Sequence, residues 1–190
     1  IVKGHDFPKV TLVGALAADM SLYTDDYRSG ERTFQLLTQA AGRAGRGDRP
    51  GEVVIQTYDP EHYAIEASAA QDYEAFYEKE IRYRSLMGYP PVENLMAVLA
   101  ACEDEALLEK ACKYLKEYIL RIKGQAQLNV IGPASPGVDK IKDIYRRVVY
   151  VKAPEYRTLV VLKDRMEQYI EINSGFQKMR IQFDFNPMNL

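Results

Sequence analysis

Val10-Thr-Leu-Val-Gly-Ala-Leu-Ala-Ala18 is a nearly continuous apolar run, which is typical of a strand in a parallel sheet that is covered on both faces. The next residues, Asp19–Ser29, are rich in Asp, Ser and Tyr and predict a loop after that strand. Apolar residues at helical spacing then predict a helix over Glu31–Ala44, followed by glycines and a proline that end it. Glu52–Tyr58 predicts a second strand. Strand, helix and strand at this spacing indicate part of an α/β doubly wound domain with a parallel sheet.

A charged stretch, Ala64–Leu86, follows this region and carries aromatic residues at helical spacing. It predicts one long helical connector that ends near Tyr89-Pro90-Pro91, because a proline disfavours the helical region for the residue before it. We therefore expect three segments. They are 1–62, the end of the α/β domain, 63–91, the connector, and 92–190, a separate domain.

The last segment predicts a small, self-contained α+β domain. Its expected elements, in chain order, are a strand at Leu95–Cys102, a helix at Glu105–Lys123, strands at Leu128–Ile131 and Ile144–Val151, a helix from Pro154 to about Asn173, and a strand at Arg180–Phe185. The order β-α-β-β-α-β is that of the split βαβ, or ferredoxin-like, arrangement.

The composition is that of an ordinary globular protein: 47% of the 190 residues are hydrophobic and 27% are charged. No apolar run reaches the roughly 18 residues that a membrane span needs, so no membrane association is expected. The chain begins at Ile1 without a signal-peptide pattern, and we expect it to be part of a longer protein. Cys102 and Cys112 lie in apolar runs, which predicts buried thiols and a reducing, cytoplasmic setting. We expect no metal or catalytic role for His5 or His62, the only histidines.

Charge is distributed unevenly behind the net charge of −2. The stretch 59–80 holds seven acidic residues and one lysine, which argues against nucleic acid lying along it. The stretch 139–165 holds eight basic and four acidic residues, which permits contacts with phosphates. Lys140, Lys142, Arg146 and Arg147 are the candidate DNA-binding residues, and a solvated strand with a positive rim is an equal alternative.

Two arginines carry the clearest chemical signal in the sequence. Arg43 and Arg46 lie three residues apart in a stretch punctuated by glycines, so both guanidinium groups can point the same way and a phosphate chain can approach closely. The alternative is a flexible basic turn, which the presence of Gln39 upstream makes the weaker reading.

Gln39-Ala-Ala-Gly-Arg-Ala-Gly-Arg46 resembles motif VI of the superfamily 2 helicases. The resemblance implies that Arg46 acts as an arginine finger on the terminal phosphate of ATP, with Arg43 as its partner, and that Gln39 orders the nucleotide site. Lys3-Gly-His-Asp-Phe-Pro8 is similar to motif V of the same superfamily. By that likeness Gly4 and Asp6 couple the nucleotide to the DNA track, and the region 1–62 is the C-terminal part of a RecA-like helicase lobe.

Further stretches resemble the PriA family (primosomal protein N′) of replication-restart helicases. They are Asp26–Thr38, Glu52–Tyr58, Pro60–His62, Arg84 with Tyr89-Pro-Pro91, and Lys140–Arg146. Two positions depart from the family pattern. Arg147 stands where the family often has an aromatic residue, and Val92 replaces the usual Phe; the first leaves open which residues of the last domain contact nucleic acid.

The resemblance implies an ATP-dependent 3′-5′ DNA helicase of the bacterial cytoplasm and nucleoid that uses ATP and Mg²⁺. It also implies a zinc module outside this chain and no metal within it. The expected partners are forked or branched DNA, single-stranded-DNA-binding protein, and the primosome and replicative-helicase loading proteins. No G-x-x-x-x-G-K-[ST] phosphate loop occurs in the chain, so we expect no ATP hydrolysis from these residues alone. The alternative is a non-catalytic DNA- or protein-binding module of another superfamily 2 helicase, in which 92–190 does the work.

Overall fold

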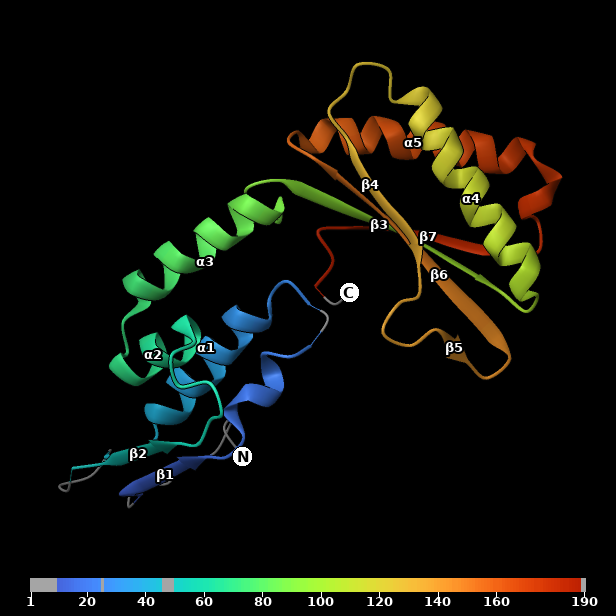
Figure 1. Cartoon of the computed structure of the whole chain (residues 1–190). Coiled ribbons are helices and arrows are strands. Elements are labelled where there is room, and N and C mark those ends of the chain that lie inside the picture. The colour runs from blue at the N-terminus through green and yellow to red at the C-terminus, as the bar shows by residue number, and fades with distance from the viewer. Residues whose placement is uncertain (1–9, 25, 46–49, 189–190) are drawn as a thin grey trace. The chain divides into compact units, whose positions relative to one another are not determined.

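The computed structural model describes residues 10–24, 26–45 and 50–188 (Figure 1). Contacts divide the chain into two compact units, residues 1–83 (unit 1) and 84–190 (unit 2). The division falls inside a helix, whereas the sequence led us to expect segment ends at 62 and 91. None of the helices in the described part of the chain is long and apolar enough to cross a membrane.

Unit 1 contains a parallel pair of short strands with helices beside it. The elements are β1 (Leu12–Ala15), the 3-10 helix η1 (Ala18–Ser21), α1 (Ser29–Ala41), β2 (Glu52–Ile55), α2 (Tyr63–Ala70) and α3 (Tyr73–Met87), which continues into unit 2. Val13 pairs with Val53 in the parallel register. The core is formed where Phe34 of α1 stacks on Phe76 of α3, with their ring centroids 4.3 Å apart. The predicted strand-helix-strand order is therefore confirmed, although both strands are shorter than expected.

The prediction of one connector helix was wrong, because the structure has two helices, α2 and α3, with a turn between them at Gln71 and Asp72. Gln71 adopts a left-handed conformation (φ 53°) as the C-cap of α2. The Asp72 carboxylate then accepts a hydrogen bond from the backbone N–H of Ala75 at 2.9 Å, which is the way a capping residue begins a new helix. The aromatic residues at helical spacing, Tyr73, Phe76 and Tyr77, all follow this break, and the alanine-rich segment before it is also typical of a helix, so the pattern does not show the interruption.

Unit 2 contains an antiparallel sheet and two helices. Its elements are β3 (Asn94–Cys102), α4 (Glu105–Ile122), β4 (Asn129–Ala134), β5 (Lys140–Ile141), β6 (Ile144–Ala153), α5 (Tyr156–Ile172), the 3-10 helix η2 (Ser174–Phe176) and β7 (Arg180–Phe185). The strand order is β4-β6-β3-β7, and β5 pairs with β6. The predicted β-α-β-β-α-β order is confirmed, and only the two-residue strand β5 and the short η2 were not expected.

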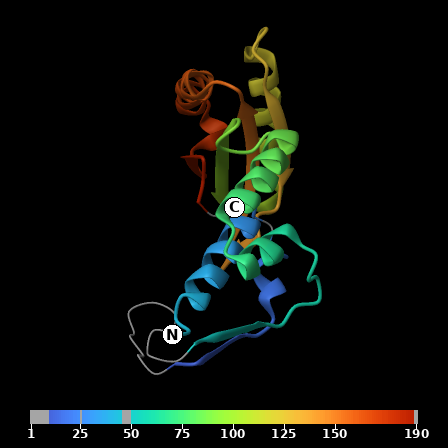
Figure 2. The ribbon, with the colours of Figure 1, turned by 90° about the vertical axis from the view of Figure 1, so that its left-hand side faces the viewer.

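Helices α4 and α5 cover one face of this sheet (Figures 1 and 2). The apolar stripe of α4 supplies Leu115 and Ile119, which pack with Leu159 of α5 on Val149 and Val151 of β6. All five side chains are fully buried. Unit 2 therefore closes a core of its own, and the other face of its sheet carries no helix of the unit.

Both cysteines are buried and unbridged, as the sequence predicts. They lie in a small apolar cluster with Ala100 and Leu108. Burial raises the pKa of the Cys112 thiol to about 12, so this thiol stays protonated at neutral pH and takes part only in packing.

Candidate functional site

The resemblance to motif VI falls on the C-terminal end of α1. Gln39 is exposed in the last turn of the helix and Arg43 is half-buried just after it. The backbone continues in tight turns there, since the N–H of Arg43 donates to the carbonyl of Ala40 at 3.0 Å. The structure thus brings Gln39 and Arg43 to the same end of α1. Arg46, Gly4 and Asp6, the other residues carried over from the helicase resemblance, lie outside the described residues.

Two glycines shape this end of unit 1. The N–H of Gly45 donates to the carbonyl of Val10, just before β1, at 3.0 Å. Gly45 has a φ of +72°, and a Cβ there would lie 2.7 Å from the backbone nitrogen of Gly51. A side chain at 45 is therefore excluded by both conformation and space. The close approach therefore holds the chain just after Arg43 beside the starts of β1 and β2.

Asp19, which the sequence gave no reason to single out, connects the other ends of the two strands. Its buried carboxylate accepts hydrogen bonds from the hydroxyl of Thr57 and from the backbone N–H of Tyr58, the latter at 2.9 Å. The hydroxyl of Thr57 and the N–H of Tyr58 hold the pKa of Asp19 below its ordinary value. The charged carboxylate therefore stabilises the turns that follow β1 and β2, and it serves structure rather than chemistry.

The predicted DNA-binding residues of unit 2 surround the β5–β6 hairpin. Lys140 of β5 lies over the ring of Tyr145, with Nζ 4.5 Å from the ring centroid, and 3.7 Å from Asp143. The hydrogen bond from Nζ to the Tyr145 hydroxyl raises the pKa of Lys140. Lys142 is exposed at the tip of the hairpin in a left-handed conformation (φ 55°).

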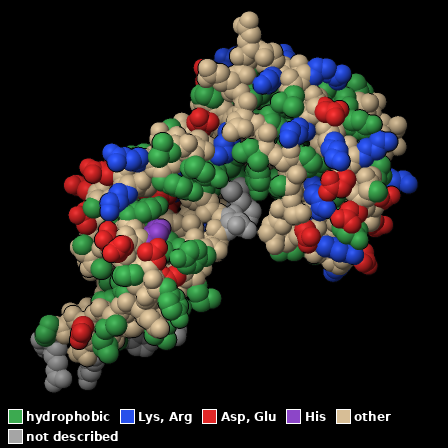
Figure 3. All heavy atoms as spheres, viewed as in Figure 1, with side chains coloured by type: hydrophobic (Ala, Val, Ile, Leu, Met, Phe, Trp, Pro, Cys, Tyr) green, Lys and Arg blue, Asp and Glu red, His purple; other side chains and the backbone are tan. Residues whose placement is uncertain are grey.

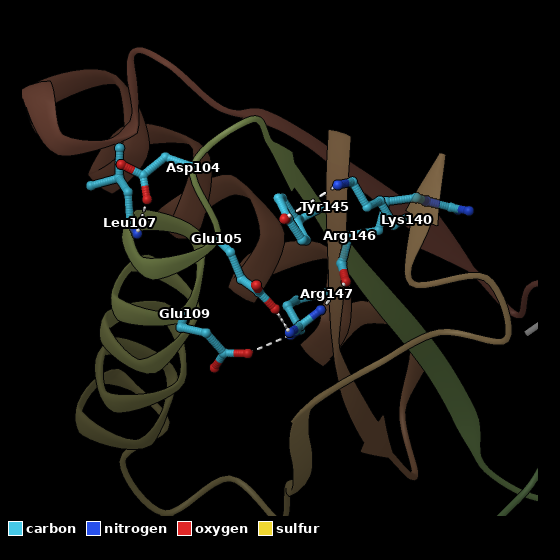
Figure 4. A network of polar contacts seen from close by, with 8 residues as sticks. All are labelled: Asp104, Glu105, Leu107, Glu109, Lys140, Tyr145, Arg146 and Arg147. Carbon is cyan, nitrogen blue, oxygen red and sulfur yellow. Dashed lines mark hydrogen bonds and ion pairs between the residues drawn. The ribbon is translucent and has the colours of Figure 1, made fainter. Parts of the chain in front are cut away.

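Arg146 and Arg147, adjacent in β6, have different surroundings. The side chain of Arg147 is only 11% exposed and forms ion pairs with Glu105, at 2.8 Å, and with Glu109, both on α4. Figure 4 shows Arg147 directed toward these two carboxylates, and their hydrogen bonds raise its pKa. Arg146 uses one guanidinium nitrogen to donate to the carbonyl of Val138 at 3.2 Å. The prediction that both contact DNA is untested, but the α4 carboxylates already neutralise Arg147.

A cleft of about 890 Å³ opens beside this hairpin. Its basic side chains are Lys142, Arg146, Lys178 and Arg180, and its acidic ones are Glu103 and Asp104. The sequence interpretation did not include Lys178 and Arg180, because they lie outside the basic stretch 139–165 and more than thirty residues after Arg147. Only the pairing of β3 with both β6 and β7 brings them to the same place.

On the face seen in Figure 3, basic and acidic side chains are interspersed over unit 2. Among the described residues, no group of three or more His, Cys, Asp or Glu side chains is placed to hold a metal ion.

The comparisons with known proteins agree with the division of the chain. The family described as "Primosomal protein N C-terminal domain" matches residues 85–188, which is nearly the whole of unit 2. Proteins named "Replication restart protein PriA" match the chain over almost its full length. The Bacillus subtilis protein is 38% identical over 98% of this chain, the Synechocystis protein 36% over 100%, and the Haemophilus influenzae protein 33% over 100%.

These matches identify the chain as part of a bacterial-type replication restart protein. It belongs to the PriA family. The chain spans about a quarter of the length of these relatives, namely 23%, 22% and 26%. A designed protein of known structure, Foldit4, aligns with 49% of the chain at a TM-score of 0.37 and 14% identity, covering 94% of that protein, and this likeness supports no inference.

Proposed function

We propose that the chain is the C-terminal portion of an ATP-dependent 3′-5′ DNA helicase that recognises stalled or branched replication forks and restarts replication through primosome assembly. Membership of the PriA family supports this role. The observation that carries it is the backbone arrangement around Gly45, which holds the end of the arginine motif beside the starts of the two parallel strands. Forked DNA, single-stranded-DNA-binding protein and the primosome loading proteins are the proposed partners.

Unit 1 is proposed to be part of a RecA-like helicase lobe. Parallel sheets in such folds have both faces covered. Each of the two strands nevertheless exposes an apolar side chain, which supports the proposal that the sheet is larger in the whole protein. Leu12 of β1 is 60% exposed and Val54 of β2 is 50% exposed. Further strands and helices of the longer protein are proposed to cover them.

The chemistry proposed for this end of α1 is stabilisation of charge during phosphoryl transfer. Bound ATP with Mg²⁺ would supply the reacting phosphate, and Gln39, Arg43 and Arg46 are the residues proposed to face it. Negative charge grows on the phosphate oxygens in the transition state, and a guanidinium group positioned in advance stabilises it. Gln39 and Arg43 offer donors and no carboxylate, which fits a phosphate rather than the metal. The remaining nucleotide contacts and the zinc module are proposed to lie on parts of the protein outside this chain.

The test uses the full-length protein that carries this chain. Arg46→Ala is expected to lower DNA-dependent ATP hydrolysis by about three orders of magnitude or more, the usual effect of losing an arginine finger. Arg82→Ala, which removes an exposed arginine of α3, serves as the matched control and is expected to leave the rate unchanged. Equal rates for the two variants would exclude the proposed role of Arg46. The 190 residues alone are expected to release no phosphate above a blank.

A second candidate function is a binding module in which unit 2 acts independently of any motor. The closed core of unit 2 favours this possibility, because residues 84–190 have the packing of an independent domain. Under this reading, residues 84–190 keep the affinity of the whole 190-residue chain for forked DNA. Under the first proposal, in which unit 1 also contacts the DNA track, removal of residues 1–83 weakens binding measurably in the same fluorescence titration.

A further inference from the structure

The floor of the cleft in unit 2 is formed by residues that pair across three adjacent strands, β6, β3 and β7. Ala101 of β3 pairs with Arg146 of β6 on one side and with Arg180 of β7 on the other. Directly paired residues in neighbouring strands point to the same face of a sheet. The small side chain of Ala101 therefore lies between two arginines, which emerge two strand spacings apart, roughly 10 Å.

This row faces away from the two helices. The next row of the sheet, Arg147–Ala100–Ile181, is on the opposite face because side chains alternate along a strand. Ala100 belongs to the apolar cluster under α4, and Arg147 is paired with carboxylates of α4. Arg146 and Arg180 consequently lie on the face that no helix of unit 2 covers.

Two lysines extend the positive charge around the cleft. Lys142 is at the tip of the β5–β6 hairpin, and Lys178 precedes β7. The left-handed backbone of Lys142 (φ 55°) costs roughly 1 kcal/mol for a residue with a Cβ, and hairpin tips usually avoid it with Gly or Asn. The fold itself therefore does not favour lysine at this position. Lys178 and Arg180 have no hydrogen-bond or ion-pair partner among the residues that the structure describes.

The acidic residues of the cleft do not cancel this charge. The carboxylate of Asp104 accepts a hydrogen bond from the backbone N–H of Leu107 at 2.9 Å and so caps α4. Glu103 is exposed. The four basic side chains outnumber the two acidic ones, and Ile141 and Ile144, 49% and 44% exposed, supply apolar wall. A cleft with a positive floor and an apolar wall suits a chain of phosphates that carries sugars and bases.

We propose that this cleft binds the sugar-phosphate backbone of a nucleic-acid strand, with Arg146, Arg180, Lys142 and Lys178 contacting phosphates and Arg147 serving only the fold. The proposal rests on the proposed function, since it gives the DNA of that function a site in unit 2. Of the candidate residues 140–147 it keeps Lys142 and Arg146, and it adds Lys178 and Arg180, so that the set comes from two strands and two loops.

The experiment compares two double variants of the 190-residue chain that remove the same charge. Arg146→Gln/Arg180→Gln changes the cleft floor, and Lys113→Gln/Arg121→Gln changes exposed residues of α4 outside the cleft. Binding of a fluorescein-labelled oligothymidine and of a labelled forked duplex is measured over a salt series. The cleft variant is expected to bind at least tenfold more weakly, with a salt slope smaller by about two, because each lost phosphate contact lowers the slope by about one. The control is expected to match the parent chain.

A third variant separates binding from folding. Lys142→Gly removes the charge while relieving the left-handed backbone, so it should bind several-fold more weakly yet unfold at the same or a higher urea concentration. This result would support the cleft even if the arginine double variant failed to fold. Unchanged affinity of Lys142→Gly and of the cleft double variant, or an equal loss in the α4 control, would overturn the proposal.

Two further outcomes also decide against the cleft as a nucleic-acid site. Polyglutamate that displaces the oligonucleotide as well as unlabelled DNA does, at equal charge, would point to an acidic polypeptide as the ligand. Binding that persists in full after all four cations are replaced would move the DNA elsewhere on the chain. Neither outcome touches the proposed motor function, which the effect of Arg46→Ala on ATP hydrolysis decides separately.

Discussion

The two units place their arginines by different means. In unit 1 Arg43 follows the end of α1, and the close approach of the backbone at Gly45 and Gly51 holds this stretch of chain beside two short strands. In unit 2 the strand alternation sets the positions, and it sends Arg146 and Arg147 to opposite faces of a complete sheet. The arginines of unit 1 can therefore be recognised from a sequence motif, whereas a role for those of unit 2 can be inferred only when the neighbouring strands are known.

The largest difference between the units is expected in their cores. Leu115 of α4 is fully buried in the closed core of unit 2, and Leu37 of α1 is 6% exposed in the smaller core of unit 1. Leu115→Ala should reduce the free energy of unfolding by about 3–5 kcal/mol, and Leu37→Ala by about 2 kcal/mol, because the surroundings of Leu37 can relax more easily. Urea denaturation with hydrogen exchange assigned to each unit measures both losses. A larger loss for Leu37→Ala would reverse the comparison.

The same contrast explains what could be predicted from the sequence. Element order in unit 2 follows from periodicity and capping residues, and Arg180–Phe185 alternates so regularly that its strand bounds were predicted to the residue. Residues such as Asp19, Lys178 and Arg180 could not be found in this way. Their surroundings depend on partners more than thirty residues away, namely Thr57 for Asp19 and the strands β3 and β6 for the two basic residues. Local patterns contain no information about such pairings.

The missed helix break has a different cause. The alanine-rich segment before Gln71 and the aromatic residues after Asp72 are both typical of a helix, so the pattern alone predicts one helix. The capping side chain of Asp72 and the left-handed Gln71 compete with that pattern locally. An Asp followed by an amphipathic run was the available signal, and it was outweighed by the length of the pattern.

A smaller effect is expected for the two adjacent arginines of unit 2. Arg147→Met keeps the aliphatic packing and removes the contacts with Glu105 and Glu109. Because these carboxylates are 48% and 38% exposed, water can solvate them after the change, and we expect a loss of about 1–2 kcal/mol. Arg146→Met should change stability by less than about 0.5 kcal/mol. Equilibrium unfolding of the two variants distinguishes them, and a larger loss for Arg146→Met would contradict the assignment of Arg147 to the fold.

The smallest effect is expected in acid and concerns unit 1. Folding lowers the pKa of Asp19 because the charged carboxylate accepts hydrogen bonds from Thr57 and Tyr58. In the unfolded chain the pKa returns to its ordinary value, so the unfolded state takes up a proton first as the pH falls. The contribution of Asp19 is therefore complete above the ordinary pKa and is lost as the pH falls through the lowered one.

Asp19→Asn tests this contribution, because the amide keeps the size of the side chain and loses the charge. The variant should be less stable than the parent chain at neutral pH, and the difference should shrink as the pH falls below the ordinary carboxyl range. Hydrogen exchange at amides of unit 1 measures the difference, with amides of unit 2 as the internal reference. A difference that stayed constant across the pH series would show that Asp19 acts through shape rather than through its charge.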